Sequence, residues 1–134
     1  MEDKHKAAAS LQEESPFKGS TGLQRLLNAT GYSLSGLRSA WRHEDAFRQE
    51  VLLAALLVPL AMFIGPTGTG KALMVFSVLL VMVVELLNSA IEATVDRISL
   101  ANHRLAKRAK DIGSAAVMIS LLNMGVIWLL VLWG

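Results

Sequence analysis

The sequence predicts an all-α membrane protein with three transmembrane helices per protomer and an amphipathic surface helix before them. Hydrophobic residues make up 53% of the chain, and the mean hydropathy is +0.46. Three apolar stretches are each long enough to cross about 30 Å of hydrocarbon at about 1.5 Å per residue. A chain of 134 residues is one domain by length, but this composition is too apolar for a soluble one.

The predicted spans also have a direction. The link GPTGTGK holds one basic residue, whereas DRISLANHRLAKRAKD holds five. By the positive-inside rule, the N-terminus and the second link face the cytoplasm, and the first link and the C-terminus face outward. The expected spans are about 47–64, 72–98 and 113–133.

Residues 22–46 carry apolar side chains at spacings of three and four, with arginines between them. This pattern is typical of an amphipathic helix lying on a membrane surface. The alternative is an amphipathic helix packed on another protein. Gly31 is expected to mark a break or a flexible point in the helix. Residues 1–20 lack the apolar core of a signal peptide and are expected to form a disordered tail before a membrane domain at 21–134.

Composition and spacing exclude several function classes. The absence of cysteine excludes disulfides and thiolate zinc sites. The basic residues are not interleaved with aromatic ones as nucleic-acid surfaces require. GPTGTGK resembles a phosphate-binding loop, but Ala72 follows Lys71 where a magnesium-binding hydroxyl is needed, and a membrane helix precedes the loop. The motif therefore predicts a tight turn between two helices.

The strongest chemical signal is a polar stripe in the second span, formed by Glu85, Asn88, Glu92 and Asp96 at steps of three, four and four. At 3.6 residues per turn, these side chains fall within about 60° of one line along the helix. Measured from Lys71, Glu85 lies about 21 Å and Glu92 about 31 Å along it. A charge near the bilayer centre costs roughly 2.5–3.5 kcal/mol, so a function is expected. The alternative is polar contact between helices without chemistry.

The acidic residues of the stripe are suited to two roles, metal binding and proton transfer. Glu85 and Glu92 are about 10 Å apart along one helix, too far to share a metal unaided, but Glu92 can join Glu44 from the segment WRHEDAFRQE. Carboxylates with water and phosphate oxygens are the ligands that Mg²⁺ prefers. Glu85, deeper and desolvated, is suited to accept a proton from a lipid hydroxyl. Lys110, beside Asp111, is a candidate phosphate ligand; the alternative is that the basic link only determines topology.

Four motifs resemble the prokaryotic integral-membrane diacylglycerol kinase family, part of a diacylglycerol/undecaprenol kinase superfamily. They are E-x-x-N-S-A-I-E-x-x-x-D at 85–96, FRQE at 47–50, GYS at 31–33 and AKDIGSAAV at 109–117. The likeness extends in order over about 22–133 and departs from the family pattern at 99–108.

The resemblance implies a lipid kinase that transfers the γ-phosphoryl group of ATP to diacylglycerol, with Mg²⁺ as cofactor. It also implies a homotrimer in the bacterial inner membrane, with active sites at the cytoplasmic interface shared between subunits. Some relatives in the superfamily phosphorylate undecaprenol instead, which leaves undecaprenol kinase as the alternative. FRQE and AKDIGSAAV favour diacylglycerol.

The resemblance also implies roles for individual residues. Glu85 would be the catalytic base, and Glu44 and Glu92 would bind Mg²⁺. ATP contacts are expected from Arg25, Tyr32, Glu44, Glu92, Asn102, His103, Lys110 and Asp111. Contacts along the lipid site are expected from Arg25, Ser33, Phe47, Arg48, Gln49, Glu50, Glu85 and Ser114. Structural support is expected from Asn88 and Asp96.

Two other function classes stay open at this point. A proton-conducting carrier would use Glu85 as a relay, although three helices offer little room for a gated path. A non-enzymatic membrane oligomer is the other alternative. In every case, one protomer buries few of its polar groups, so self-association is expected.

Overall fold

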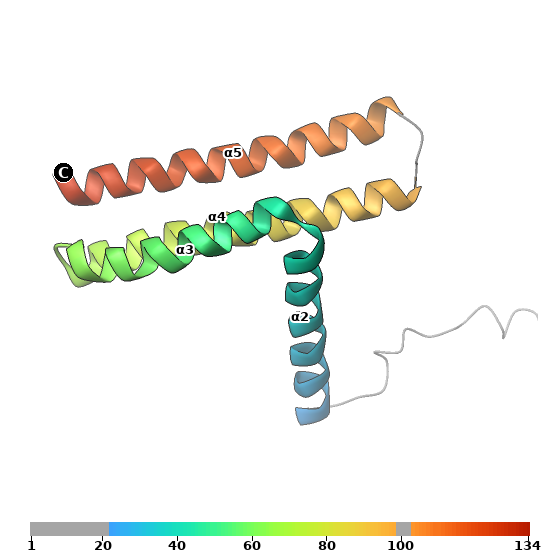
Figure 1. Ribbon diagram of the computed structural model, residues 1–134, viewed down its shortest axis with the longest axis horizontal. Helices are drawn as coiled ribbons and strands as arrows, with labels where there is room; N and C mark the ends of the chain where they lie inside the picture. Colours follow the sequence, from blue (N-terminus) through green and yellow to red (C-terminus); the bar gives the residue numbers. More distant parts are fainter. Residues whose placement is uncertain (1–21, 99–102) are drawn as a thin grey trace, which may run out of the picture. The chain divides into compact units, whose positions relative to one another are not determined.

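The computed structural model describes residues 22–98 and 103–134, which form four helices and contain no strand (Figure 1). Three of these helices are long and apolar enough to cross a membrane, which confirms the predicted spans. The chain is therefore a multi-pass membrane protein. The predicted tail at 1–20 lies outside the described residues. The helices are α2 (Leu23–His43), α3 (Asp45–Ile64), α4 (Gly68–Ile98) and α5 (Arg104–Trp133).

Helix α2 is continuous, so a break at Gly31 is wrong, and a flexible point there stays a prediction. A single glycine inside a helix costs only about 1 kcal/mol, which its neighbours overcome here. The chain divides into two units at Arg38, and most of α2 belongs to the first. Its leucines, such as Leu23 and Leu34, are exposed, so the described part of the chain does not cover the apolar face of this helix. Its position at a membrane surface stays a prediction.

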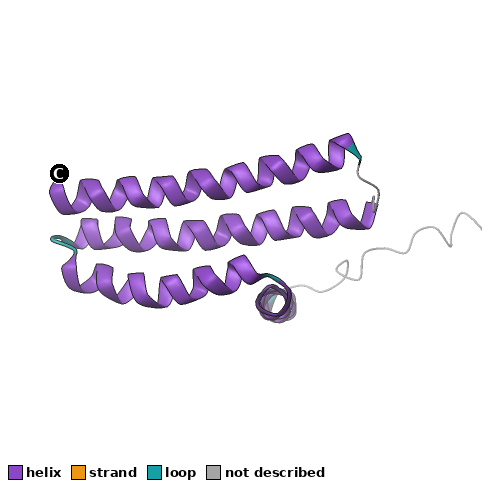
Figure 2. Cartoon of the chain, turned by 45° about the horizontal axis from the view of Figure 1, so that its top comes forward, coloured by secondary structure: helices purple, strands orange, loops and turns teal. Residues whose placement is uncertain are grey.

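The other three helices form the second unit, in which α4 packs against both α3 and α5 (Figure 2). The link between α3 and α4 is the tight turn that the sequence predicts. Gly65 donates its N–H to the carbonyl of Ala61 at 3.0 Å. The hydroxyl of Thr67 accepts a hydrogen bond from the N–H of Gly70 at 3.0 Å, which satisfies one of the free donors at the start of α4.

The buried side chains lie mainly along one face of α4. This face begins with apolar residues, among them Met74 and Val81, and continues into Glu85 and Asn88. Small residues on neighbouring helices, such as Ala61 on α3, let the backbones approach closely. The polar stripe is therefore the continuation of the apolar packing face.

The three helices differ in length. Helices α4 and α5 have 31 and 30 residues and α3 has 20. The end of α4 and the start of α5 extend past the N-terminal end of the shorter α3 (Figure 2). Helix α5 begins at Arg104, before the apolar span predicted from residue 113. The helix extends beyond the apolar span because its polar first turns can lie in water. This extension carries the basic residues.

Candidate functional site

The acid stripe of α4 passes from the buried core to the surface. Glu85 is only 5% exposed and Asn88 is 9% exposed, whereas Glu92 is half-buried and Asp96 is exposed. The two deeper members of the stripe therefore face protein and not lipid. The stripe therefore connects the helix packing with the aqueous end of α4.

Other carboxylates approach Glu85 from α3. Glu85 lies within electrostatic range of Glu92 and of Glu44, and Glu50 lies within range of Glu85. The helix lengths explain why Glu44 is near. It stands 20 residues before Ile64, and Asn88 stands 20 residues after Gly68, so antiparallel helices of equal rise place the two at one level. The structure brings the predicted partners Glu44 and Glu92 to the same region.

Asn88 connects this region to α5. Its amide nitrogen donates a hydrogen bond to Glu92 at 3.4 Å, and this orientation is required because a carboxylate only accepts. Its side-chain oxygen is buried, with no hydrogen-bond partner among the described residues. That oxygen lies against Gly113, where an added Cβ would overlap it. Gly113 therefore leaves the room in which Asn88 can reach Glu92.

Two ion pairs organise the aqueous ends of α4 and α5. Lys110 contacts Asp96 at 2.5 Å and so links the two helices. Lys107 contacts Asp111 at 2.6 Å within α5. The predicted ATP residues Lys110 and Asp111 are consecutive on α5, so their side chains point in different directions; Lys110 contacts Asp96 of the stripe.

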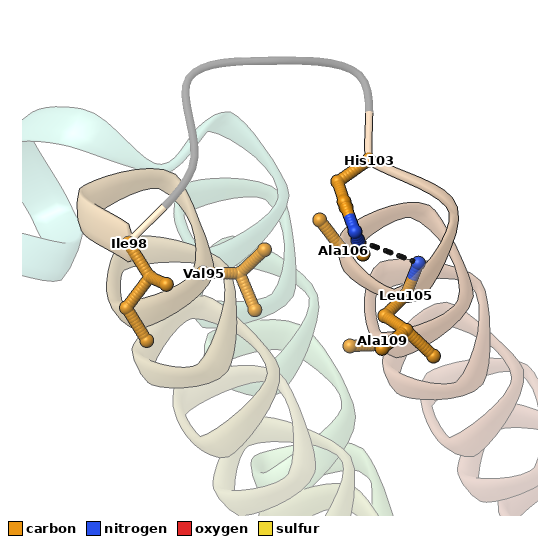
Figure 3. A pocket seen from close by; sticks show the side chains of 6 residues that line it. All are labelled: Val95, Ile98, His103, Leu105, Ala106 and Ala109. Atoms are coloured by element: carbon orange, nitrogen blue, oxygen red, sulfur yellow. Dashed lines mark hydrogen bonds between the residues drawn. The ribbon is translucent and has the colours of Figure 1, made fainter.

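A hollow of about 380 Å³ lies between the same two helix ends (Figure 3). His103 is at the start of α5, where its ring nitrogen accepts a hydrogen bond from the N–H of Leu105 at 3.2 Å. It therefore caps the helix as well as lining the hollow. Asn102, which is also a predicted ATP contact, lies outside the described residues. The remaining lining is apolar: Val95, Ile98, Leu105, Ala106 and Ala109.

The predicted lipid residues near the start of α3 have different surroundings. Phe47 is buried and Gln49 is exposed. One carboxylate oxygen of Glu50 is buried, with no hydrogen-bond partner within the described part of the chain. Arg48 donates hydrogen bonds to the backbone at the end of α2. Ser114, on α5, is exposed beside the buried Gly113.

Three further predicted residues, Arg25, Tyr32 and Ser33, lie on α2 in the first unit. All three are exposed. The hydroxyl of Ser33 donates to the carbonyl of Ala29 at 2.9 Å, a common arrangement for a serine inside a helix. Their contacts with ATP or lipid stay predictions.

Comparison with known proteins identifies relatives over most of the chain. A family model described as prokaryotic diacylglycerol kinase matches residues 31–132. A diacylglycerol kinase of Pseudomonas aeruginosa is 56% identical over 120 residues, covering 90% of this chain and 98% of that protein. The Haemophilus influenzae protein of the same name is 55% identical, covering 81% and 92%. The Escherichia coli K12 protein is 48% identical, covering 85% and 93%.

The contact between Gly113 and Asn88 gives a testable prediction. Gly113→Ala should lower the free energy of unfolding in detergent micelles by roughly 1–3 kcal/mol, because the added methyl overlaps a buried amide. In an Asn88→Ala background the same change should cost nearly nothing, so the double-mutant cycle should show coupling.

Gly125→Ala is the matched control, because a Cβ at Gly125 meets no other atom within 4 Å. It should leave the stability unchanged or raise it by up to about 1 kcal/mol, since alanine favours the helix. Equal effects of Gly113→Ala with and without Asn88 would show that the two residues are not in contact.

Proposed function

Because the chain belongs to the prokaryotic diacylglycerol kinase family, we propose that it transfers the γ-phosphoryl group of ATP to the hydroxyl of diacylglycerol, giving phosphatidic acid. One observation of the structure carries the proposal. A buried acid in the central membrane helix, Glu85, lies within electrostatic range of Glu44 and Glu92 at the end of the bundle. A lipid hydroxyl can reach this region from the membrane, and a nucleotide can reach it from water.

Glu85 is the proposed general base. Its carboxylate accepts the proton of the lipid hydroxyl, whose oxygen then forms a bond to the γ-phosphorus while the bond to the β–γ bridging oxygen breaks and ADP leaves. Such a transfer depends mainly on positioning and charge neutralisation. A deep, largely desolvated carboxylate is suited to the task because few waters compete for it.

Residues at the aqueous ends of α4 and α5 are the proposed nucleotide site. The Lys110 ammonium is a point charge for a phosphate, and its contact with Asp96 at 2.5 Å places it beside the acid stripe. Asp111 is adjacent on α5. The apolar hollow beside His103 offers surface for a purine ring. Arg25 and Tyr32 of α2 complete the proposed ATP contacts.

The donor set fits a magnesium ion shared with ATP. Among the described residues, no three acidic or histidine side chains by themselves form a metal cluster. Mg²⁺ usually takes only one or two carboxylates, with water and substrate phosphates as further ligands. Glu44 and Glu92 would supply these carboxylates, and the gathered negative charge around Glu85 favours a cation nearby. When bound, the ion would neutralise charge on the phosphate oxygens.

The proposed lipid site lies at the start of α3 and along α4. Phe47, Gln49 and Glu50 are the proposed contacts there, and Glu50 lies within electrostatic range of Glu85. Ser114 of α5 and Ser33 and Arg25 of α2 are proposed to contact the lipid as well.

We further infer that the chain is a homotrimer in the bacterial inner membrane, with active sites shared between subunits. In one protomer only 17% of the apolar window of α3 and 6% of that of α5 are buried. This leaves helix surface on which further copies can pack. The basic residues before and within α5 support a cytoplasmic N-terminus and an outward C-terminus.

The function is tested by transfer of label from ATP in mixed micelles that contain diacylglycerol or undecaprenol in parallel. Diacylglycerol should acquire the label. Glu85→Gln should lower the rate by roughly 10²–10⁴-fold, the usual contribution of a general base, while unfolding at nearly the same temperature because the side chains have similar shapes.

Other outcomes would contradict this proposal in distinct ways. Preferential labelling of undecaprenol would change the substrate, and normal turnover by purified Glu85→Gln would exclude Glu85 as the base. If neither lipid acquires label, a non-enzymatic oligomer is favoured. Proton flux through liposomes without ATP would instead favour a proton conductor.

The magnesium proposal predicts a change in metal dependence. At fixed ATP, Glu92→Gln should raise the Mg²⁺ concentration for half-maximal rate by roughly 10–100-fold, since a ligand is lost. Glu92→Asp, which keeps the charge on a shorter side chain, should recover part of that loss. An unchanged Mg²⁺ requirement in both variants would remove Glu92 from the metal site.

A further inference from the structure

The junction between α2 and α3 consists of one residue, Glu44. Helix α2 ends at His43 and α3 begins at Asp45, and Glu44 between them has an extended backbone with φ −115° and ψ 106°. The side chain of Glu44 makes no hydrogen bond to the start of α3. Its carboxylate is therefore available, but only the backbone of the junction holds it in place.

Arg48 bridges this junction from the first turns of α3. Its guanidinium donates hydrogen bonds to the carbonyls of Trp41 at 2.9 Å and Arg42 at 3.3 Å, both in the last turn of α2. Those carbonyls lack partners within their own helix, and a cation at a helix C-terminus is also favoured by the helix dipole. The other end of the fork pairs with Asp45.

The backbone contacts are the more effective part of this arrangement. Asp45 is 82% exposed, and exposed ion pairs contribute little because water screens them. The carbonyl contacts, in contrast, join two helices across a single extended residue. Two further bonds complete the junction: the N–H of Glu44 donates to Ala40 at 2.9 Å, and that of Arg48 donates to Glu44 at 3.2 Å.

We propose that Arg48 is a positioning residue, which clamps the junction between α2 and α3 and thereby holds the Glu44 carboxylate at the acid site. The inference rests on the proposed function, in which Glu44 binds the metal and nucleotide. It gives Arg48 a role different from the lipid contact expected from the family resemblance. A planar guanidinium reaches two carbonyls and a carboxylate at once, which a lysine ammonium does not reproduce.

The first readout needs neither nucleotide nor lipid. In the ligand-free protein, amide hydrogen exchange at residues 43–46 should become roughly tenfold faster in Arg48→Gln. The reason is that the hydrogen bonds from the charged guanidinium, which close the junction, are lost. Arg48→Lys should lie between this variant and the native protein. Asp45→Asn should have a smaller effect, because the carbonyl contacts remain.

The second readout is kinetic. Arg48→Gln should raise the Mg²⁺ and ATP concentrations needed for half-maximal rate and lower the rate by roughly 10–100-fold, the expected result of a misplaced ligand. The KM for diacylglycerol should stay near the native value. Arg97→Gln, which removes the same charge from an exposed position on α4, is the control for general loss of positive charge.

Two results would overturn the proposal. Native exchange at the junction in both Arg48 variants would show that Arg48 does not hold it, and Arg48→Lys keeps this test available if the glutamine variant does not fold. A rise in the KM for diacylglycerol with an unchanged Mg²⁺ dependence would assign Arg48 to the lipid instead. Glu44→Gln, measured in parallel, distinguishes a failure of the metal role from a failure of the clamp. An unchanged Mg²⁺ dependence in Glu44→Gln contradicts the proposed metal role of Glu44. The hydrogen-exchange rates of the Arg48 variants still decide whether Arg48 clamps the junction.

Discussion

The arrangement of this protein depends on shielding carboxylates from hydrocarbon. A membrane helix that carries several acids is stable only if their side chains face protein, water or cations. Helix α4 meets this requirement by lying between α3 and α5, so that the face carrying Glu85 is the face that packs. The same placement that protects the acid also gives it defined neighbours. The contacts that pack the membrane helices are therefore the same contacts that place the acidic side chains of the site.

The site forms at the level where α3 begins, while α4 and α5 continue. Asn88 of α4 lies against Gly113 of α5 at this level, and Glu44 directly precedes α3. Beyond that level, the extensions of α4 and α5 carry Asp96 and Lys110. A single helix therefore spans the distance between the proposed base, Glu85, and the proposed nucleotide site at the aqueous end. This gradient is suited to a reaction between one substrate dissolved in lipid and another dissolved in water.

Sequence reasoning predicted the long-range plan well and the local contacts poorly. The spans follow from hydropathy and the stripe from helical periodicity, whereas the shared metal role of Glu44 and Glu92 stays a prediction. The role of Gly113, which lies within AKDIGSAAV, was missed. The need for a glycine becomes evident only when the structure shows that Asn88 occupies the space of a Cβ there. The break at Gly31 was predicted wrongly, since a propensity of about 1 kcal/mol does not decide the course of a helix.

By itself, the sequence determined that the chain crosses a membrane three times, which face of the middle helix is polar, and which family it resembles. These properties follow from composition and from the constant period of the α-helix, and they need no knowledge of neighbours. Only the tertiary structure decided that Asn88 meets Gly113, that Asp96 holds Lys110, and that Arg48 closes the junction at Glu44. The contacts of Asn88 and of Asp96 depend on the register between two helices, and those of Arg48 depend on how far its side chain reaches across the junction. Neither the register nor this reach can be read from the periodicity of the sequence.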